Sequence, residues 1–417
     1  MERVVKIIVL ALCFFAASSC SKENAPESPS DEVAPVANNE YKPIILDEKQ
    51  KSLALNGNAM ADKYLYTVLT SEEKDFMISP LGLQIVLGMV MNGASDAAFK
   101  SACEALGYNG ITRTDLNEYL QLMALSMPAI DKLTKLESAN MAVVNNKFSL
   151  KEDFVNILHR YYDAYVKNED FSNLSVVAGN INAWCNNNTH GLIPSVSLPL
   201  KENTVMAILD ALYFKSAWTD KFSSKETSKE YFYFADGTRS KVNMMKKESY
   251  MNVSFSNKCT YLKLPFGNGA FYMMIALPNK GVSLEEMLEQ GTSNIDWIIA
   301  NVDLWMPKFK IEYTKELNEI LEKMGLGCLI DGNFSNISSA LEQGRLLYQQ
   351  DTAFEVNEEG TTASAVTSVT GFYTSAGPDS SNPAKLVLHL DRPFVYYIRE
   401  SSTGATLFAG RYGAKAN

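Results

Sequence analysis

Apolar residues in the first half of the chain recur at helical spacing. Between Lys49 and Thr70 they fall mainly on one helical face, which predicts an amphipathic helix. Ser79 and Pro80 then suit the N-cap and the first turn of a second helix. Residues 81–91 are apolar on nearly every side, so this helix should be buried. Two more helices are predicted, at Asp115–Ala129 and Lys151–Val166.

The pattern becomes that of strands after about residue 200. Thr204–Phe214 is a long apolar run, which predicts a central strand covered on both faces. Asp236 and Gly237 form a favoured tight-turn pair and predict a hairpin over Tyr231–Met245. Further strands are predicted at Tyr261–Phe266, Phe271–Leu277, Trp305–Ile311, Arg345–Val356, Leu386–Leu390, Phe394–Arg399 and Thr406–Tyr412, with one more helix at Lys315–Met324.

Helices therefore dominate early in the chain and strands late. This order indicates an α+β fold rather than a repeating βαβ arrangement. Residues 44–414 contain no internal repeat and no obvious linker, so one large domain is predicted over 44–417. A chain of 417 residues, 46% of them hydrophobic, can bury a large core.

The first 43 residues differ from this domain in composition. Residues 1–19 have a basic start, a short apolar run and a small-residue end, as in a secretory signal peptide. The residues before Cys20 resemble a bacterial lipobox, in which the cysteine is lipidated, although Ala17 stands where an aliphatic residue is usual. An ordinary signal with a chance cysteine stays open.

Residues 20–43 are accordingly predicted to be a lipid anchor followed by a flexible tether. The segment after the cysteine is rich in Ser, Pro, Glu, Asp and Asn, and such a composition cannot bury enough surface to order itself. We expect the protein to be anchored in the bacterial cell envelope, on either the periplasmic or the outer side. The lipid would be its only contact with the membrane.

Charge and motif content argue against several other functions. The net charge of −10 is unsuited to a nucleic-acid partner. The three histidines form no metal-ligand pair, and no nucleophile elbow, P-loop or dinucleotide motif occurs. His159 and His389 are expected to be structural. We therefore expect no enzyme, metal site or cofactor.

Four cysteines fall within the predicted domain, at Cys103, Cys185, Cys259 and Cys328. Their wide spacing suits neither zinc nor redox chemistry and predicts separate, mostly buried thiols. A disulfide stays open if the compartment is oxidising.

The most unusual segment follows Gly360. Eighteen uncharged residues run from Thr361 to Pro378, and a loop of this length inside a domain is usually functional. Its Thr and Val residues favour a strand rather than a flexible linker. In an extended conformation Thr361, Ala363, Ala365, Thr367 and Val369 would share one face, and all are small enough for a crowded interior.

The run EVNEEGTTASAV at 355–366 resembles the hinge of the serpin family. Other blocks resemble serpins in family order: FMISPLGLQIVLGMVMNGA (76–94), ALYFKSAWTDKF (211–222), YLKLPFGNGAFYMMIALPNKG (261–281), LWMPKFKIE (304–312) and DRPFVYYIRESSTGATLFAGR (391–411). Together they cover essentially residues 50–412. The resemblance implies a serpin fold, with large mixed and antiparallel sheets, a helical cluster and an exposed reactive-centre loop.

The resemblance also implies a mechanism. A target protease would cleave the loop and form a covalent acyl-enzyme, and the cut loop would then insert into the main sheet and distort the attached protease. The chain would thus be a serine, and possibly cysteine, protease inhibitor, and a monomer. A strand over Thr361–Thr374 would span about 46 Å at roughly 3.3 Å per residue.

Residue roles follow by position in the family pattern. The hinge would comprise Glu358, Glu359, Gly360, Thr361, Thr362, Ala363, Ser364, Ala365, Val366 and Thr367. Thr362 replaces an acid that many members carry, but it should point outward. The usual loop length places the reactive bond at Thr374–Ser375, which suits elastase-like or subtilisin-like proteases. Cleavage after Tyr373 or Phe372 would instead suit a chymotrypsin-like enzyme, and papain-like targets stay open.

Positions that would control sheet opening are only partly those of the family. Lys308 is expected to pair with Glu358, and Trp218 to lie under the opening point. Ser79 is retained beneath the sheet, but Gly82, Asp210 and Gln350 replace its usual hydrogen-bonding partners. The group of residues that holds the sheet closed, here termed the latch, should therefore be built differently.

Two other functions stay open. One is a non-inhibitory serpin that acts as a binding protein and whose loop is cut without trapping. The other is an envelope hydrolase that uses unrecognised residues.

Overall fold

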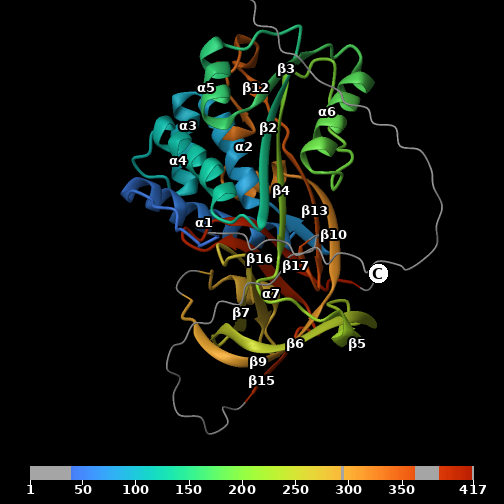
Figure 1. Ribbon diagram of the computed structural model, residues 1–417. Helices are drawn as coiled ribbons and strands as arrows, with labels where there is room; N and C mark the ends of the chain where they lie inside the picture. The colour runs from blue at the N-terminus through green and yellow to red at the C-terminus, as the bar shows by residue number, and fades with distance from the viewer. Residues whose placement is uncertain (1–38, 293–294, 362–384, 416–417) are drawn as a thin grey trace, which may run out of the picture. The chain divides into compact units, whose positions relative to one another are not determined.

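A computed structural model describes residues 39–292, 295–361 and 385–415, all within one compact unit of the chain (Figure 1). This unit begins at Asn38, before the predicted domain boundary at residue 44. The predicted signal peptide and Cys20 lie outside the described residues. None of the helices in the described ranges has the length and apolar character needed to span a bilayer.

All the longer helices except α5 begin at side-chain caps. Asp47 and Gln50 form a capping box at the start of α1, and Ser79 accepts the Gly82 N–H at the start of α2, with Pro80 in its first turn. The helices are α1 (Glu48–Leu69), α2 (Pro80–Gly93), α3 (Asp96–Leu106), α4 (Arg113–Ser126), α5 (Glu152–Tyr162), α6 (Leu174–Asn188), α7 (Leu284–Leu288) and α8 (Asn318–Lys323). The sequence did not predict α3, α6 or α7.

Two large sheets contain nearly all the strands. The main sheet has the order β10 (Phe309–Glu316), β13 (Gln349–Asn357), β14 (Gly360–Thr361), β4 (Met206–Ala217), β2 (Thr134–Asn145) and β3 (Tyr165–Glu169). The second sheet has the order β1 (Phe76–Ile78), β17 (Thr406–Tyr412), β16 (Phe394–Glu400), β8 (Phe271–Pro278), β7 (Cys259–Phe266), β6 (Arg239–Phe255), β9 (Ile298–Pro307) and β15 (Leu386–His389), and β5 (Ser228–Tyr233) pairs with β6. A small sheet joins β11 (Asp331–Gly332) to β12 (Gly344–Arg345).

Both faces of the main sheet are covered at β2 and β4. Alternate residues of β2 point to opposite faces, so Ala142 joins the large core with α2, whereas Met141 and Val143 pack in a small cluster with α6. Figure 1 accordingly shows α2 and α6 on opposite sides of β2 and β4. The main sheet is therefore sandwiched between the helical cluster and α6.

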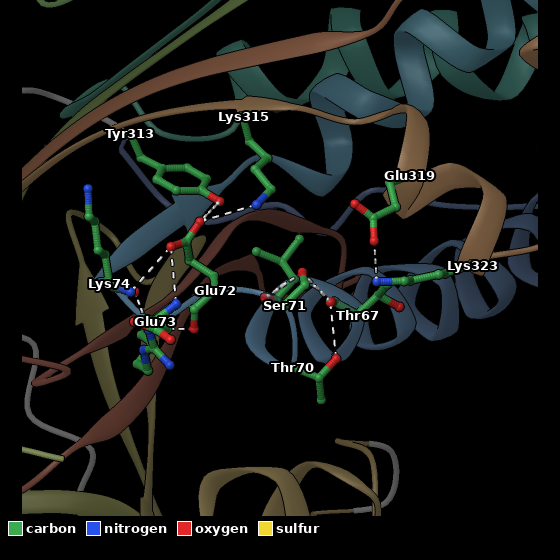
Figure 2. A network of polar contacts seen from close by, with 12 residues as sticks. Thr67, Thr70, Ser71, Glu72, Glu73, Lys74, Tyr313, Lys315, Glu319 and Lys323 are labelled. Carbon is green, nitrogen blue, oxygen red and sulfur yellow. Dashed lines mark hydrogen bonds and ion pairs between the residues drawn. The ribbon is translucent and has the colours of Figure 1, made fainter. Parts of the chain in front are cut away.

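The outer strand β10 is fixed to the end of α1. The Glu72 carboxylate accepts hydrogen bonds from the Tyr313 hydroxyl at 3.1 Å and from Lys315 at 3.2 Å (Figure 2). Burial alone would raise the pKa of Glu72, but these hydrogen bonds and that of the Lys74 backbone outweigh it and lower the pKa. The β10–β13 side of the sheet is thereby tied to the helices.

Several predicted elements have other bounds. The predicted strand Trp305–Ile311 is wrong as one element: β9 and β10 belong to different sheets, and between them the Lys308 N–H bonds to the Asn243 carbonyl. The predicted helix Lys151–Val166 ends at Tyr162, because Asp163 adopts a left-handed conformation with φ 46°. The following residues Tyr165–Glu169 pair as β3.

Three further differences concern residues near the candidate site. The predicted helix Lys315–Met324 begins only at Asn318, because Lys315 and Glu316 still pair with β13. The predicted strand Arg345–Val356 begins at Gln349. The predicted central strand forms as β4, and both its faces are covered: Ile208 packs against the large core and Leu209 against the cluster with α6. Its residues 206–210 are nevertheless only half-buried, because they line a cavity.

The hairpin around Asp236–Gly237 forms as predicted, and so do the three C-terminal strands, as β15, β16 and β17. The four cysteines of the described residues are free thiols, three of them buried and Cys328 half-buried.

Candidate functional site

Two residues of the predicted hinge form a short strand inside the main sheet. Gly360 and Thr361 form β14 and pair antiparallel with the end of β13 on one side and the end of β4 on the other. Gly360 has φ 140°, and a Cβ there would lie 2.2 Å from the Ser216 carbonyl oxygen, so only glycine fits. Thr361 is buried, and its Oγ1 accepts the Ser216 N–H at 3.0 Å.

Beyond β14 no strand lies between the facing edges of β13 and β4 in the described part of the chain. Along 349–355 β13 is paired with β10, and along 206–214 β4 is paired with β2 and not with β13. We term the space between these two edges the lane. The lane opens into a cavity of about 600 Å³, lined mainly by apolar side chains of α2, residues 193–200, β4 and residues 341–351. A smaller cavity above it is lined by Leu212, Phe214, Thr352 and Phe354, among others.

Two ion pairs hold the turn between β13 and β14. Lys308 contacts Glu358 at 2.7 Å, as the sequence predicts, and the Thr227 hydroxyl donates to the same carboxylate at 2.7 Å. Burial alone would raise the pKa of Glu358, but these two hydrogen bonds outweigh it and hold the pKa below its usual value. Lys221 contacts Glu359 at 2.5 Å. Sequence analysis missed this second pair, since no spacing rule connects residues so far apart.

Trp218 lies directly beneath this turn. It is 3% exposed and stacks on Phe266, with ring centroids 4.4 Å apart. Its indole Nε1 donates to the Asn357 carbonyl at 2.9 Å, and its backbone N–H donates to the Glu359 carbonyl at 2.9 Å. Trp218 therefore fixes the point at which the lane begins.

The substituted latch positions also come together. Gln350 on β13 makes two hydrogen bonds to the backbone of Ser79: its Oε1 accepts the Ser79 N–H at 2.7 Å and its Nε2 donates to the Ser79 carbonyl at 2.9 Å. The Ser79 hydroxyl donates to the Leu407 carbonyl at 2.9 Å. This chain thus ties β13 to the N-terminus of α2 through a glutamine side chain.

Asp210 places a carboxyl group beneath the sheet, between α2 and β2. A Cβ on Gly82 would lie 2.4 Å from Asp210 Oδ2, so glycine at 82 makes room for this carboxyl. The Ser138 hydroxyl donates to Asp210 Oδ1 at 3.3 Å, and the residue lines both cavities. Burial raises the pKa of Asp210 to about 7, against which the Ser138 hydrogen bond is too weak.

The substitution Asp210→Asn is expected to flatten the pH dependence of stability. Because the folded-state pKa is raised above the usual value of about 4, this carboxyl lowers stability as the pH rises between about 4 and 7. Above pH 7 the asparagine variant should be more stable than the wild type by on the order of a few kcal/mol, whereas the two should agree near pH 4. Urea unfolding at pH 4.5 and pH 8 measures this, and equal pH dependence in both proteins would contradict it.

The remaining predicted site residues lie outside the described ranges. They are the distal hinge residues Thr362, Ala363, Ser364, Ala365, Val366 and Thr367, and the candidate reactive-bond residues Phe372, Tyr373, Thr374 and Ser375. Their roles stay predictions. Among the described residues no group of three or more His, Cys, Asp or Glu side chains is arranged to hold a metal ion.

The chain is similar to known proteins over most of its length. Residues 56–413 match the family model described as serpin (serine protease inhibitor). Intracellular coagulation inhibitor 1 of Tachypleus tridentatus is 31% identical over 364 residues, which are 83% of this chain and 85% of that protein. The solved structure of Serpin48 from the insect Tenebrio molitor has a TM-score of 0.76 at 26% identity, covering 89% of this chain and all of its own. Tengpin, a thermophilic serpin solved in its native state, has a TM-score of 0.74 at 26% identity, covering 90% of this chain and 97% of its own.

Proposed function

Because the chain belongs to the serpin family and has the α+β fold that the sequence predicts, we propose that it inhibits serine-type endopeptidases as a suicide substrate. The protease serine attacks the carbonyl carbon of Thr374, and the peptide bond to Ser375 breaks. The Ser375 amine leaves with a proton from the protease, and an ester joins the protease to Thr374. Insertion of the cut loop into the lane then prevents hydrolysis of this ester.

The observation that carries the proposal is the lane with β14 at its top. Gly360 and Thr361 already pair with both neighbouring strands, so their register defines where an inserted strand would run. Continued down the lane, this register places Ala363 opposite Phe214 and Phe354. The same register sets Ala365 opposite Leu212 and Thr352, and Thr367 opposite Asp210 and Gln350.

Side-chain size along the loop fits this register. Phe214 and Phe354 are buried and face the core that joins the two sheets, so the inserted residue between them must be small. Thr361, Ala363, Ala365 and Thr367 meet this requirement. β4 provides pairing positions as far as Met206, which would lie opposite Gly371 of the inserted loop. Met206 also lines the large cavity.

The location is part of the proposal. We propose that Cys20 is lipidated, that the protein is held in a bacterial cell envelope and acts there as a monomer, and that the membrane is met only through the lipid. The support is the composition of residues 1–38. Thr374 favours elastase-like or subtilisin-like targets, Tyr373 or Phe372 would favour chymotrypsin-like ones, and a papain-like cysteine protease could form the corresponding thioester.

A mixing experiment tests this function. The protein is incubated with elastase, subtilisin, chymotrypsin and papain, and we expect an SDS-resistant complex with at least one of them. Mass spectrometry of the released C-terminal fragment should find Ser375 at its N-terminus, or Thr374 or Tyr373 if cleavage follows an aromatic residue. Complete loop cleavage without any complex would favour the non-inhibitory binding protein, and turnover of an added peptide substrate by the protein itself would favour a hydrolase.

A further inference from the structure

The described chain begins with a residue that is bound to the domain through its side-chain amide and its backbone carbonyl. Asn39 falls in the segment that the sequence predicts as tether. Its Nδ2 donates to Asp131 Oδ1 at 2.9 Å, its Oδ1 accepts the Lys132 N–H at 2.8 Å, and its carbonyl accepts Asn268 Nδ2 at 3.1 Å. Asn39 is therefore a fixed point where the tether would meet the domain.

Asp131 is a buried carboxylate held by several donors. It is 1% exposed, and besides Asn39 it accepts the Leu133 N–H at 2.9 Å and the Thr134 hydroxyl at 2.6 Å. A Cβ on Gly267, where φ is +48°, would lie 1.9 Å from its Oδ2, so the neighbouring turn is shaped around this group. Loss of any one donor would leave a buried charge less well satisfied.

The hydrogen bonds continue from Asp131 to the hinge. Thr134 Oγ1 lies 2.7 Å from Ser216 Oγ, and because the single Thr134 hydroxyl proton is given to Asp131, Ser216 is the donor. Ser216 is the residue of β4 that pairs with Thr361: its N–H donates to Thr361 Oγ1, and its carbonyl accepts the Thr361 hydroxyl at 3.3 Å. Thr134, Ser216 and Thr361 are all buried.

We infer that Asn39, Asp131, Thr134 and Ser216 form a relay that positions the hinge for insertion, so that the junction with the tether controls how fast the loop enters the sheet. The inference rests on the proposed inhibitory function. The relay holds Ser216 in place through its hydroxyl group, and the backbone N–H and carbonyl of Ser216 bind Thr361, from which the inserting strand would continue. Removing the Asn39 side-chain amide should leave the Ser216 backbone less firmly positioned, because cooperative hydrogen bonds are lost together. Insertion of the loop should then be slower.

The test compares the full-length wild type with Asn39→Ala and with the matched control Glu40→Ala, which changes an exposed neighbour. The readouts are the stoichiometry of inhibition and the rate of complex formation with a protease that the wild type traps. Loss of one hydrogen bond of ordinary net strength predicts roughly threefold to tenfold slower insertion in N39A and a higher share of cleaved, untrapped protein. E40A should match the wild type.

A second variant separates positioning from general destabilisation. Thr134→Val cuts the relay between Asp131 and Ser216 without touching the N-terminal segment, and it should slow insertion as N39A does. Since both changes break one chain of contacts, N39A/T134V should be no slower than the slower single variant, whereas independent destabilisation would multiply the two effects.

Three outcomes can be distinguished. Slower trapping in both single variants, with no multiplication in the double variant, supports the relay. Trapping at the wild-type rate in N39A overturns the relay while the inhibitory function stands. A wild type that forms no complex with any protease removes the proposed function, and the relay with it.

Discussion

The substitution Ala363→Arg is expected to turn the inhibitor into a substrate. The register that β14 begins would place residue 363 between Phe214 and Phe354. Phe214 contacts Phe266 and Phe271 edge to face at 5.6 and 5.5 Å, and Phe354 stacks on Tyr396 at 5.9 Å. A guanidinium group in this apolar layer has no partner, and burying it would cost several kcal/mol. A barrier raised by this amount slows insertion more than about 100-fold, so deacylation completes first.

The measurement is the fraction of protease found in SDS-resistant complex, together with the fraction of inhibitor found cleaved. The matched control is Thr362→Arg, which adds the same group one residue earlier. The register places residue 362 on the outward face, opposite Lys215 and Glu355, which are both partly exposed. T362R should therefore still trap protease. Undiminished trapping by A363R would mean that the loop does not insert in this register.

Local chemistry explains which elements the sequence could predict. Ser79–Pro80 and Asp236–Gly237 specify a helix start and a tight turn through their own backbone preferences, and both form as expected. The division between β9 and β10 carries no such signal. It arises because the Lys308 N–H is bound by Asn243, a residue of another strand, and that contact exists only in the folded protein.

The residues of the candidate site also differ in whether the sequence alone could identify them. The small residues after Gly360 predict a hinge because their composition is unusual for a loop, and those beyond Thr361 lie outside the described residues, so this stays a prediction. The pairing of Lys308 with Glu358 was expected from family resemblance and is present. Asp210 and Gln350 could be recognised only as departures from the family pattern. The sequence does not show that Gln350 binds the Ser79 backbone, or that Asn39, Asp131, Thr134 and Ser216 form a continuous path. These residues come from separate segments, and only tertiary packing brings their polar atoms within bonding distance.

Cutting the loop of the free protein is expected to raise its Tm by on the order of 10 °C. A cut releases the residues after Thr361 to follow β14 down the lane, where the register offers them the edge of β4 as far as residue 371 and the edge of β13 as far as residue 368. Each new hydrogen bond contributes about 0.5–1.5 kcal/mol, and filling the cavity of about 600 Å³ buries further apolar surface. After the cost of ordering the loop, a net gain of about 5 kcal/mol corresponds to roughly 10 °C for a domain of this size.

Differential scanning calorimetry of the intact and the nicked protein measures this gain, with mass spectrometry to verify a single cut between Phe372 and Ser375. The same nick in A363R is the control, because its loop is severed but cannot enter the lane past residue 362, so its Tm should rise little. A wild type that melts no higher after the nick would mean that the lane does not accept the loop. The energy needed to distort an attached protease would then have no source, whatever complex the gel shows.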